Sequence, residues 1–510
     1  MVDLANGVRG REYGLGKSWA DVEAVMQPTE EQVAIVDAAA CVKRLVVKAG
    51  AGTGKTATLE LVAKKIRKPT IYTAYNTAIV KEAAGRFPSH VECRTAHSLA
   101  FGAVGHRYRG RLGGARQTGQ RAASVLSTHW VDLGGDARIS PAQLARVAVA
   151  TVGRFCNSAD DEIFARHVPR QNGLSRSEHD ALALSVLPFA RRAWSDICDP
   201  EGRLRFEHDH YLKMWALTRP LLPADVVMLD EAQDSNPVVA RLVQDQVSAQ
   251  QIACGDSNQS MYEWRGAVDA LDRWNADEVL YLSQSWRFGQ VIADEANKWL
   301  ARLDTPLRLT GNPRLASRLA DLELPAAILC RTNGEAMKQV MNLLTEGRKV
   351  ALVGRSRDMI NLAQAAAELK SEGRTGHPEL YVFTSWGALQ DYVENEPDGR
   401  DLKPFVDLVD AHGTDAIIDS LEALVPEDKA QTTVSTAHKS KGRQWKTVSI
   451  ADDFPGDGEQ RGSEDTSKAD SMVAYVAVTR AQLLLDRGSL AWIDQGAVDS
   501  GTTKNGGTHD

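Results

Sequence analysis

Apolar runs and amphipathic stretches alternate along the first hundred residues. The apolar run 45–50 (LVVKAG) has the length and composition of a buried strand, and segment 56–68 after it has helical spacing. A second apolar run, 69–75 (PTIYTAY), is followed by another helix-like stretch, 76–87. Strands that alternate with helices are typical of βαβ units, so the pattern predicts an α/β fold with a parallel sheet.

The strand pattern returns further along the chain. Three apolar runs end in polar residues, at 224–234, 250–256 and 277–285. A second alternating region starts near Pro325 and resumes at 431–442 and 446–454. The polar, Gly-rich segment Phe454–Asp470 is expected to be a loop, and the tail is expected to be disordered.

Two segments interrupt this alternation and predict insertions. From about residue 99 to 221 the spacing is mostly helical, and from 356 to 429 it is mixed. The expected organisation is therefore two sheet domains, each with one insertion. The predicted bounds are 1–98 with 222–283, insertion 99–221, 284–355 with 430–495, a reduced insertion 356–429, and the tail 496–510.

The bulk properties narrow the class of protein. A chain of 510 residues is too long for one core. It has no apolar run of about 18 residues and no charged-then-apolar N-terminal signal, so neither a membrane span nor export is expected. Six dispersed cysteines without a CxxC pair argue against a zinc site or a disulfide framework. The cysteine pattern fits a reducing cell interior, so a cytoplasmic location is expected.

The net charge of −7 argues by itself against a nucleic-acid partner, yet a protein that binds nucleic acid needs only a basic channel and not a basic surface overall. Segment 93–131 contains no Asp or Glu and carries six arginines. A solvated arginine-rich loop explains this segment equally well.

A phosphate-binding motif follows the first strand. The sequence AGAGTGKT (Ala49–Thr56) lies between an apolar strand and a helix, which is the context that a P-loop requires. Backbone N–H groups there are expected to surround phosphate oxygens, with Lys55 reaching the β- and γ-phosphates and Thr56 ligating Mg²⁺. The expected nucleotide-binding residues of the loop are Gly50, Ala51, Gly52, Thr53, Gly54, Lys55 and Thr56.

An acidic pair ends the run VVMLDE. Asp230 is expected to hold Mg²⁺, and Glu231 is expected to activate the attacking water as a general base. Such a pair alone is a common surface feature, but together with the P-loop it predicts ATP hydrolysis.

Four further motifs stand in a familiar order: DEAQD, GDSNQSMYEWRGA (255–267), AHKSKG (437–442) and AYVAVTRA (474–481). In this order the chain resembles superfamily 1 DNA helicases of the UvrD/Rep/PcrA type. Segments 73–102, 211–220 and 281–289 resemble most the helicase core of F-box DNA helicases. The resemblance implies a compact viral or bacterial relative, located in the cytoplasm of a bacterium or an infected host cell and associated with the nucleoid.

The resemblance implies further roles at the ATP site. It implies that Gln32 binds the adenine edge and that Trp286 stacks on adenine. It also implies that Gln259 senses the γ-phosphate, while Arg287 and Arg480 act as arginine fingers from the second domain. Gln444 departs from the family pattern, because it stands where relatives carry a carboxylate.

The resemblance also implies a DNA-binding surface. Tyr75 and Trp264 are expected to stack on bases. Contacts to phosphates or bases are expected from Asn76, Thr95, His97 and His438.

The expected protein is therefore a motor with two RecA-like domains that uses ATP and Mg²⁺. Its expected partners are single-stranded DNA and single-strand/duplex junctions, with recombinase or replication proteins, and it is expected to be a monomer that moves 3′→5′. A translocase that clears recombinase filaments without efficient unwinding is the main alternative. A degenerate DNA-binding scaffold and a small-molecule P-loop kinase are further ones.

Overall fold

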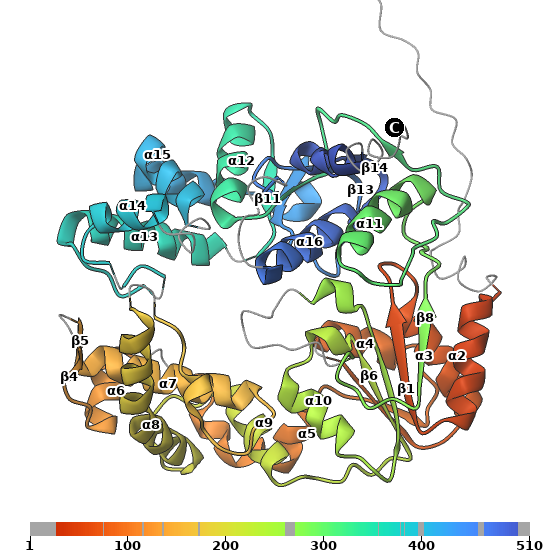
Figure 1. Ribbon diagram of the computed structural model, residues 1–510, viewed down its shortest axis with the longest axis horizontal. Coiled ribbons are helices and arrows are strands. Elements are labelled where there is room, and N and C mark those ends of the chain that lie inside the picture. The colour runs from red at the N-terminus through yellow and green to blue at the C-terminus, as the bar shows by residue number, and fades with distance from the viewer. Residues whose placement is uncertain are drawn as a thin grey trace, which may run out of the picture.

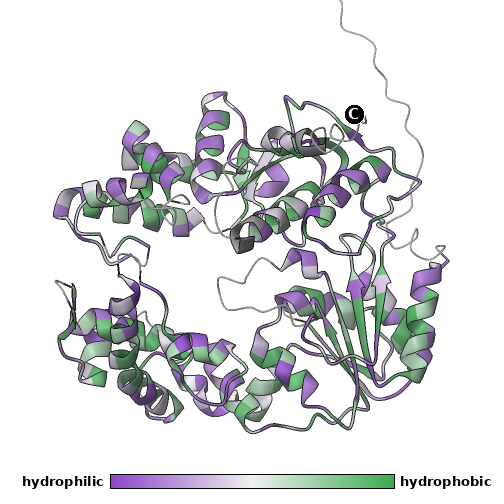
Figure 2. Ribbon diagram, viewed as in Figure 1, coloured by the Kyte–Doolittle hydropathy of each residue, from purple (hydrophilic) through white to green (hydrophobic). Residues whose placement is uncertain are grey.

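The computed structural model describes residues 27–497, apart from 75, 115–116, 135–136, 172–173, 261–270, 355, 378, 382, 396–401 and 457–463. Two parallel sheets lie on one side of the molecule, and the helical segments that interrupt them lie on the other (Figure 1). Figure 2 shows hydrophobic residues gathered on the strands of the first sheet and on the inward faces of the helices. The expected α/β fold with parallel sheets is confirmed.

The first sheet has six parallel strands. Their order is β3 (Val91–Cys93), β2 (Thr70–Ala74), β6 (Val226–Asp230), β7 (Gln250–Gly255), β1 (Arg44–Ala49) and β8 (Glu278–Leu282). Helices α2 (Glu30–Cys41), α3 (Lys55–Ile66), α4 (Thr77–Ala84) and α10 (Pro237–Gln244) accompany it. All residues of β2 and β6 are buried, which explains their continuous apolar character in the sequence.

The second sheet also has six parallel strands. Their order is β11 (Val350–Leu352), β12 (Thr432–Thr436), β10 (Ala327–Cys330), β13 (Trp445–Ile450), β14 (Ala481–Asp486) and β9 (Arg318–Leu319). Its helices are α11 (Gln290–Arg302), α12 (Asn333–Thr345) and α16 (Glu464–Val478), with the 3₁₀ segment η8 (Gly488–Ala497) at the end.

The start of α16 corrects one prediction. The polar loop expected to run to Asp470 is wrong in its last part, because the helix begins at Glu464. Polar composition suggested a loop, but α16 packs on α11 through Val473, Val476 and Ala477, which are buried. Tertiary packing of one face therefore decides the helix boundary.

The first insertion consists mainly of helices, as predicted from the spacing of its apolar residues. Its elements are α5 (Ala96–Ala103), η1 (Gly105–Arg111), α6 (Gly119–Leu126), β4 (Val131–Gly134), β5 (Ala137–Ile139), α7 (Pro141–Asn157), η2 (Ala165–His167), α8 (Arg176–Cys198) and α9 (His208–Leu217). Helix α7 starts with a capping box, since Ser140 and Gln143 satisfy each other's backbone N–H groups, and Pro141 occupies the first turn.

The second insertion is helical in the part of the chain that the structure describes, so the mixed character expected for 356–429 is wrong. It contains α13 (Ser356–Glu372), α14 (Trp386–Asn395), α15 (Lys403–Glu422) and η7 (Glu427–Lys429). A kink at Gly413, whose φ is 76°, breaks the helical period of α15 and obscures it in the sequence.

The two insertions touch each other. The Tyr381 hydroxyl, from the second insertion, donates a hydrogen bond to Gln171 of the first. The guanidinium of Arg146, on α7, lies 5.1 Å from the centre of the Tyr381 ring. The two insertions thus contact each other on the side of the molecule away from the sheets (Figure 1).

Candidate nucleotide site

The loop between β1 and α3 is shaped by two glycines. Gly52 and Gly54 have φ values of 74° and 80°, a left-handed conformation that favours glycine. A Cβ on Gly52 would lie 2.6 Å from Cβ of Arg287 and 2.7 Å from Oγ of Ser285, so no larger residue fits. The loop ends where α3 begins at Lys55, which points the free N–H groups of the helix at the same space.

Four side chains converge beside this loop. Thr56 Oγ1 donates a hydrogen bond of 2.7 Å to Asp230 Oδ2, and Asp230 is fully buried at the end of β6. Lys55 Nζ lies 3.4 Å from Glu231 Oε1. The structure thus brings together the four residues that the two sequence motifs predicted for phosphate, Mg²⁺ and water.

The charges in this cluster balance one another. Burial would lower the pKa of Lys55, but the nearby carboxylates, Glu231 foremost, raise it above its ordinary value. Burial raises the pKa of Asp230, and the charge of Glu231 raises it further. Burial acts in the same sense on Glu231, but Lys55 outweighs it, so the pKa of Glu231 is lowered. The ammonium therefore stabilises Glu231 as the ionised carboxylate.

The donor set fits Mg²⁺. A hydroxyl and a carboxylate oxygen, 2.7 Å apart beside a helix N-terminus, are the hard oxygen ligands that this ion prefers next to a phosphate. Thr56 and Asp230 are therefore the residues that would hold it.

The two predicted arginines lie at the same site and come from segments that lead into the second sheet. Arg480, which follows α16, is 1% exposed and donates to Gln259 Oε1 over 3.2 Å. Arg287, which precedes α11, donates to the Thr479 carbonyl and to Gln444 Oε1, over 3.0 Å each. Burial lowers the pKa of both arginines, and the charge of Arg287 lowers that of Arg480 further.

The segment that carries Arg287 also holds the phosphate loop by its backbone. Ser285 Oγ donates to the Ala51 carbonyl over 2.8 Å, and the Trp286 N–H donates to the Gly52 carbonyl over 2.8 Å. Inside the loop, Thr53 Oγ1 donates to the Gly50 carbonyl. The loop thus accepts hydrogen bonds from the segment that leads into the second sheet.

The residues expected at adenine lie at one end of the loop. A Cβ on Gly54 would lie 3.8 Å both from Nε2 of Gln32 and from Cδ1 of Trp286. Gln32 caps α2 with Thr29 and donates from Nε2 to Thr58 over 3.0 Å. One N–H of the Gln32 amide remains for a ligand beside the indole of Trp286.

The predicted DNA residues follow the carboxyl ends of strands. Asn76 follows β2, Thr95 follows β3 and His438 follows β12. Asn76 and Thr95 also cap α4 and α5, so their side-chain oxygens already accept backbone N–H groups. His97 Nε2 lies 2.9 Å from Asp209 Oδ1, a contact that ties it to α9. Tyr75 and Trp264 lie outside the described residues.

Several residues of the site were not singled out in the sequence. Gln233 donates to Glu231 Oε2 over 2.7 Å and accepts the Asp256 N–H over 2.9 Å. Tyr72 donates to Asp230 over 2.7 Å. Lys441 pairs with Asp234 across the two sheets over 2.6 Å. Gln233, Asp234 and Lys441 lie inside the motifs DEAQD and AHKSKG, and that position was the available signal.

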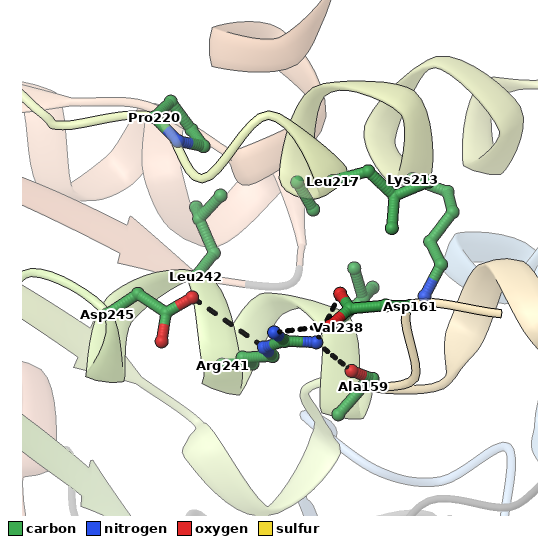
Figure 3. A pocket seen from close by; sticks show the side chains of 10 residues that line it. Ala159, Asp161, Lys213, Leu217, Pro220, Val238, Arg241, Leu242 and Asp245 are labelled. Atoms are coloured by element: carbon green, nitrogen blue, oxygen red, sulfur yellow. Dashed lines mark hydrogen bonds and ion pairs between the residues drawn. The ribbon is translucent and has the colours of Figure 1, made fainter.

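A small pocket of about 10 Å³ lies elsewhere, where the first insertion meets α10 (Figure 3). Arg241 of α10 points into it, pairs with Asp161 over 2.8 Å and donates to the Ala159 carbonyl. Lys213 lies on its other wall. The pocket has room for about one water and its polar groups are paired, so it is a structural joint between the insertion and the sheet.

The fold and this site define a P-loop nucleotide-binding protein of the α/β class. The model of the AAA domain family matches residues 32–265, which run from Gln32 past Gln259. Such a domain implies nucleotide binding, usually with Mg²⁺.

The chain is also similar to two curated proteins. One is "F-box DNA helicase protein 1" of Schizosaccharomyces pombe, 28% identical over 494 residues, which cover 86% of this chain and 54% of that protein. The other is "F-box DNA helicase 1" of Gallus gallus, 27% identical over 483 residues, 86% of this chain and 46% of that protein. The chain spans about half the length of these relatives, and it is a relative of DNA helicases. None of the described helices is both long and apolar enough to cross a membrane.

Proposed function

We propose that this chain is an ATP-dependent DNA helicase or translocase that moves on single-stranded DNA. One observation carries the proposal: segments that lead into the second sheet contact the phosphate loop and Gln259 of the first unit. Arg480 contacts Gln259, and the Arg287 segment binds the backbone of Gly52. A site divided between two units changes their relative position when nucleotide binds and leaves, which is what a motor requires.

Each residue of the site has a separate role in ATP hydrolysis. Lys55 binds the β- and γ-phosphates. Glu231, which Lys55 keeps ionised, orients and deprotonates the attacking water. Thr56 and Asp230 would hold Mg²⁺, which would supply positive charge next to the phosphates. Gln259 senses the γ-phosphate. Arg287 and Arg480 spread positive charge over the transferring phosphoryl group.

The two sheets are, in this proposal, RecA-like domains. The first comprises 1–98 and 222–283, and the second 284–355 and 430–495, with the insertions 99–221 and 356–429. Sheets of this kind carry ligands at the carboxyl ends of their strands. Asp230 ends β6, and Asn76 and His438 follow the ends of β2 and β12, which supports a DNA track beside the ATP site.

DNA binding is proposed for Asn76, Thr95, His97 and His438, with Tyr75 and Trp264 as stacking platforms. The similarity to DNA helicases supports DNA as the track. Movement in the 3′→5′ direction and binding at single-strand/duplex junctions rest on the resemblance to superfamily 1 helicases alone. We propose roles in replication, recombination or repair on the same ground.

The deciding experiment is the ATPase rate of the purified chain with and without oligothymidine. Strong stimulation supports the motor, and a rate that is indifferent to DNA contradicts it. A strand-displacement assay on 3′- and 5′-tailed duplexes then tests unwinding and direction. Stimulated hydrolysis without displacement, together with release of recombinase from single strands, favours filament clearance over unwinding.

A further inference from the structure

The hydroxyl of Tyr475 joins the phosphate loop to a buried carboxylate. Tyr475 lies on α16 of the second sheet and is completely buried. Its hydroxyl accepts the Ala51 N–H over 3.1 Å and donates to Asp256 Oδ2 over 3.2 Å. Both partners belong to the first sheet, so one hydroxyl from the second unit is held by two groups of the first.

Asp256 continues this contact toward the catalytic groups. Its Oδ2 also accepts the amide of Gln259 over 2.6 Å, and Gln259 Oε1 accepts from Arg480 over 3.2 Å. The Asp256 N–H donates to Gln233, whose amide donates to Glu231. A continuous set of hydrogen bonds thus runs from the general base to the arginine, with Asp256 at its centre.

Tyr475 and Arg480 lie on the same short piece of backbone. Arg480 Nε donates to the Val476 carbonyl over 2.9 Å, which fixes the arginine to the last turn of α16. The guanidinium is therefore tied to the helical turn that follows Tyr475. Burial raises the pKa of Tyr475 and the Asp256 carboxylate raises it further, so the hydroxyl keeps the proton that it donates.

We propose that Tyr475 is a positioning residue that sets the distance between Arg480 and the phosphate loop by bridging Ala51 and Asp256. The inference rests on the proposed function, because it assigns how that site is assembled. Opening of the two units breaks both hydrogen bonds of the hydroxyl at once. The bridge therefore acts through Arg480 and leaves the nucleotide contacts of Lys55 and Thr56 unchanged.

The test variant is Tyr475→Phe, which keeps the buried ring and removes only the hydroxyl. The matched control is Tyr281→Phe, the same change on the exposed face of β8. DNA-stimulated kcat should fall about tenfold in Tyr475→Phe, while equilibrium affinity for a fluorescent ATP analogue changes less than about threefold. The control should match the wild type in both.

A double variant separates positioning from a general packing defect. Adding Tyr475→Phe to Arg480→Ala should lower kcat no further, because the bridge acts through the arginine that is already missing. An unchanged kcat in Tyr475→Phe, additive losses in the double variant, or parallel falls of affinity and melting temperature would each overturn the proposal.

Hydrogen exchange tests whether the Tyr475 hydroxyl bridges to the Ala51 N–H, and it requires no ATP turnover. In nucleotide-free protein, peptides that cover 45–58 should exchange faster in Tyr475→Phe than in wild type, because the Ala51 N–H loses its acceptor. Equal exchange refutes the bridge. If wild type shows no DNA-stimulated hydrolysis, the proposed function fails, and this comparison still decides the role of Tyr475.

Discussion

Lys55 Nζ lies 3.4 Å from Glu231 Oε1. The Lys55 ammonium, which is proposed to bind the phosphates, thus neutralises the Glu231 carboxylate, which is proposed to activate the water. Glu231 adopts this position with φ of 51°, a left-handed conformation that is rare outside glycine and frequent at functional sites. ATP binding has to draw Lys55 toward the phosphates, which leaves Glu231 free to orient water.

Removal of the lysine tests this pairing. Lys55→Ala should lower ATP hydrolysis by about a hundredfold or more, because the charge on the phosphates loses its partner. The affinity for oligothymidine without nucleotide should stay within about twofold of the wild-type value, because Lys55 lies in the phosphate loop and is not one of the proposed DNA-binding residues. Fluorescence anisotropy beside a phosphate-release assay measures both quantities. Near-normal turnover in the folded variant would rule out the P-loop assignment.

The arginines should matter most in the transition state. Arg287→Ala and Arg480→Ala should each lower kcat by about a thousandfold, the effect of an arginine finger, and change ATP affinity much less. Arg191→Ala is the control, because this arginine is exposed on α8 in the first insertion. If only KM rises in the two site variants, the arginines bind the ground state and the finger role is wrong.

Gln444 should act by holding Arg287. Its Oε1 accepts a hydrogen bond from Arg287 Nε over 3.0 Å. Gln444→Leu removes the acceptor at similar size and should lower kcat about fivefold. Gln444→Glu keeps an acceptor and should stay near wild type. Steady-state kinetics on both variants test this, and equal losses in the two would show that the contact is incidental.

Trp264 remains the proposed stacking platform on DNA, five residues after Gln259 in the sequence. Trp264→Ala should cost about 1–3 kcal/mol of single-strand affinity and leave the salt dependence of binding unchanged, because phosphate contacts survive. DNA-independent hydrolysis should persist. A core tryptophan would instead lose about 3–5 kcal/mol of folding stability. A large fall in melting temperature with unaltered affinity would therefore contradict the platform.

His210 predicts a loss of stability in acid. Burial lowers its pKa from 6.5 to about 4, and its Nδ1 accepts the Glu207 N–H over 2.9 Å, which requires the neutral ring. Between these values the unfolded chain binds a proton that the folded chain does not, so stability falls as pH falls from 6.5 toward 4. The full effect is about 3 kcal/mol.

The variant His210→Gln keeps an acceptor at the third position of α9, which suits a capping box. Its melting temperature should fall less between pH 7 and pH 5 than that of wild type. His106→Gln, a change of an exposed histidine, should follow the wild type. Equal pH dependence in all three proteins would contradict the role of His210.

Contiguous motifs were readable in the sequence because local geometry determines them. A strand, a glycine loop and a helix N-terminus form a phosphate site from Ala49 to Thr56, and a buried strand that ends in Asp230 brings its carboxylate to the same sheet edge. The helical insertion was readable for a similar reason, since period and capping act within a few residues.

The sequence alone determined the parallel α/β class and the positions of the phosphate lysine and the acidic pair, through periodicity and chain-local motifs. Tertiary structure decided the rest. Tyr475 and Asp256 are 219 residues apart, yet their contact depends on how two sheets meet. The contact between Gln444 and Arg287, which are 157 residues apart, also depends on how the sheets meet. Tertiary packing likewise decides where α16 begins. Contacts between distant segments form only when burial of both sheets fixes their relative position, and no local pattern encodes that position.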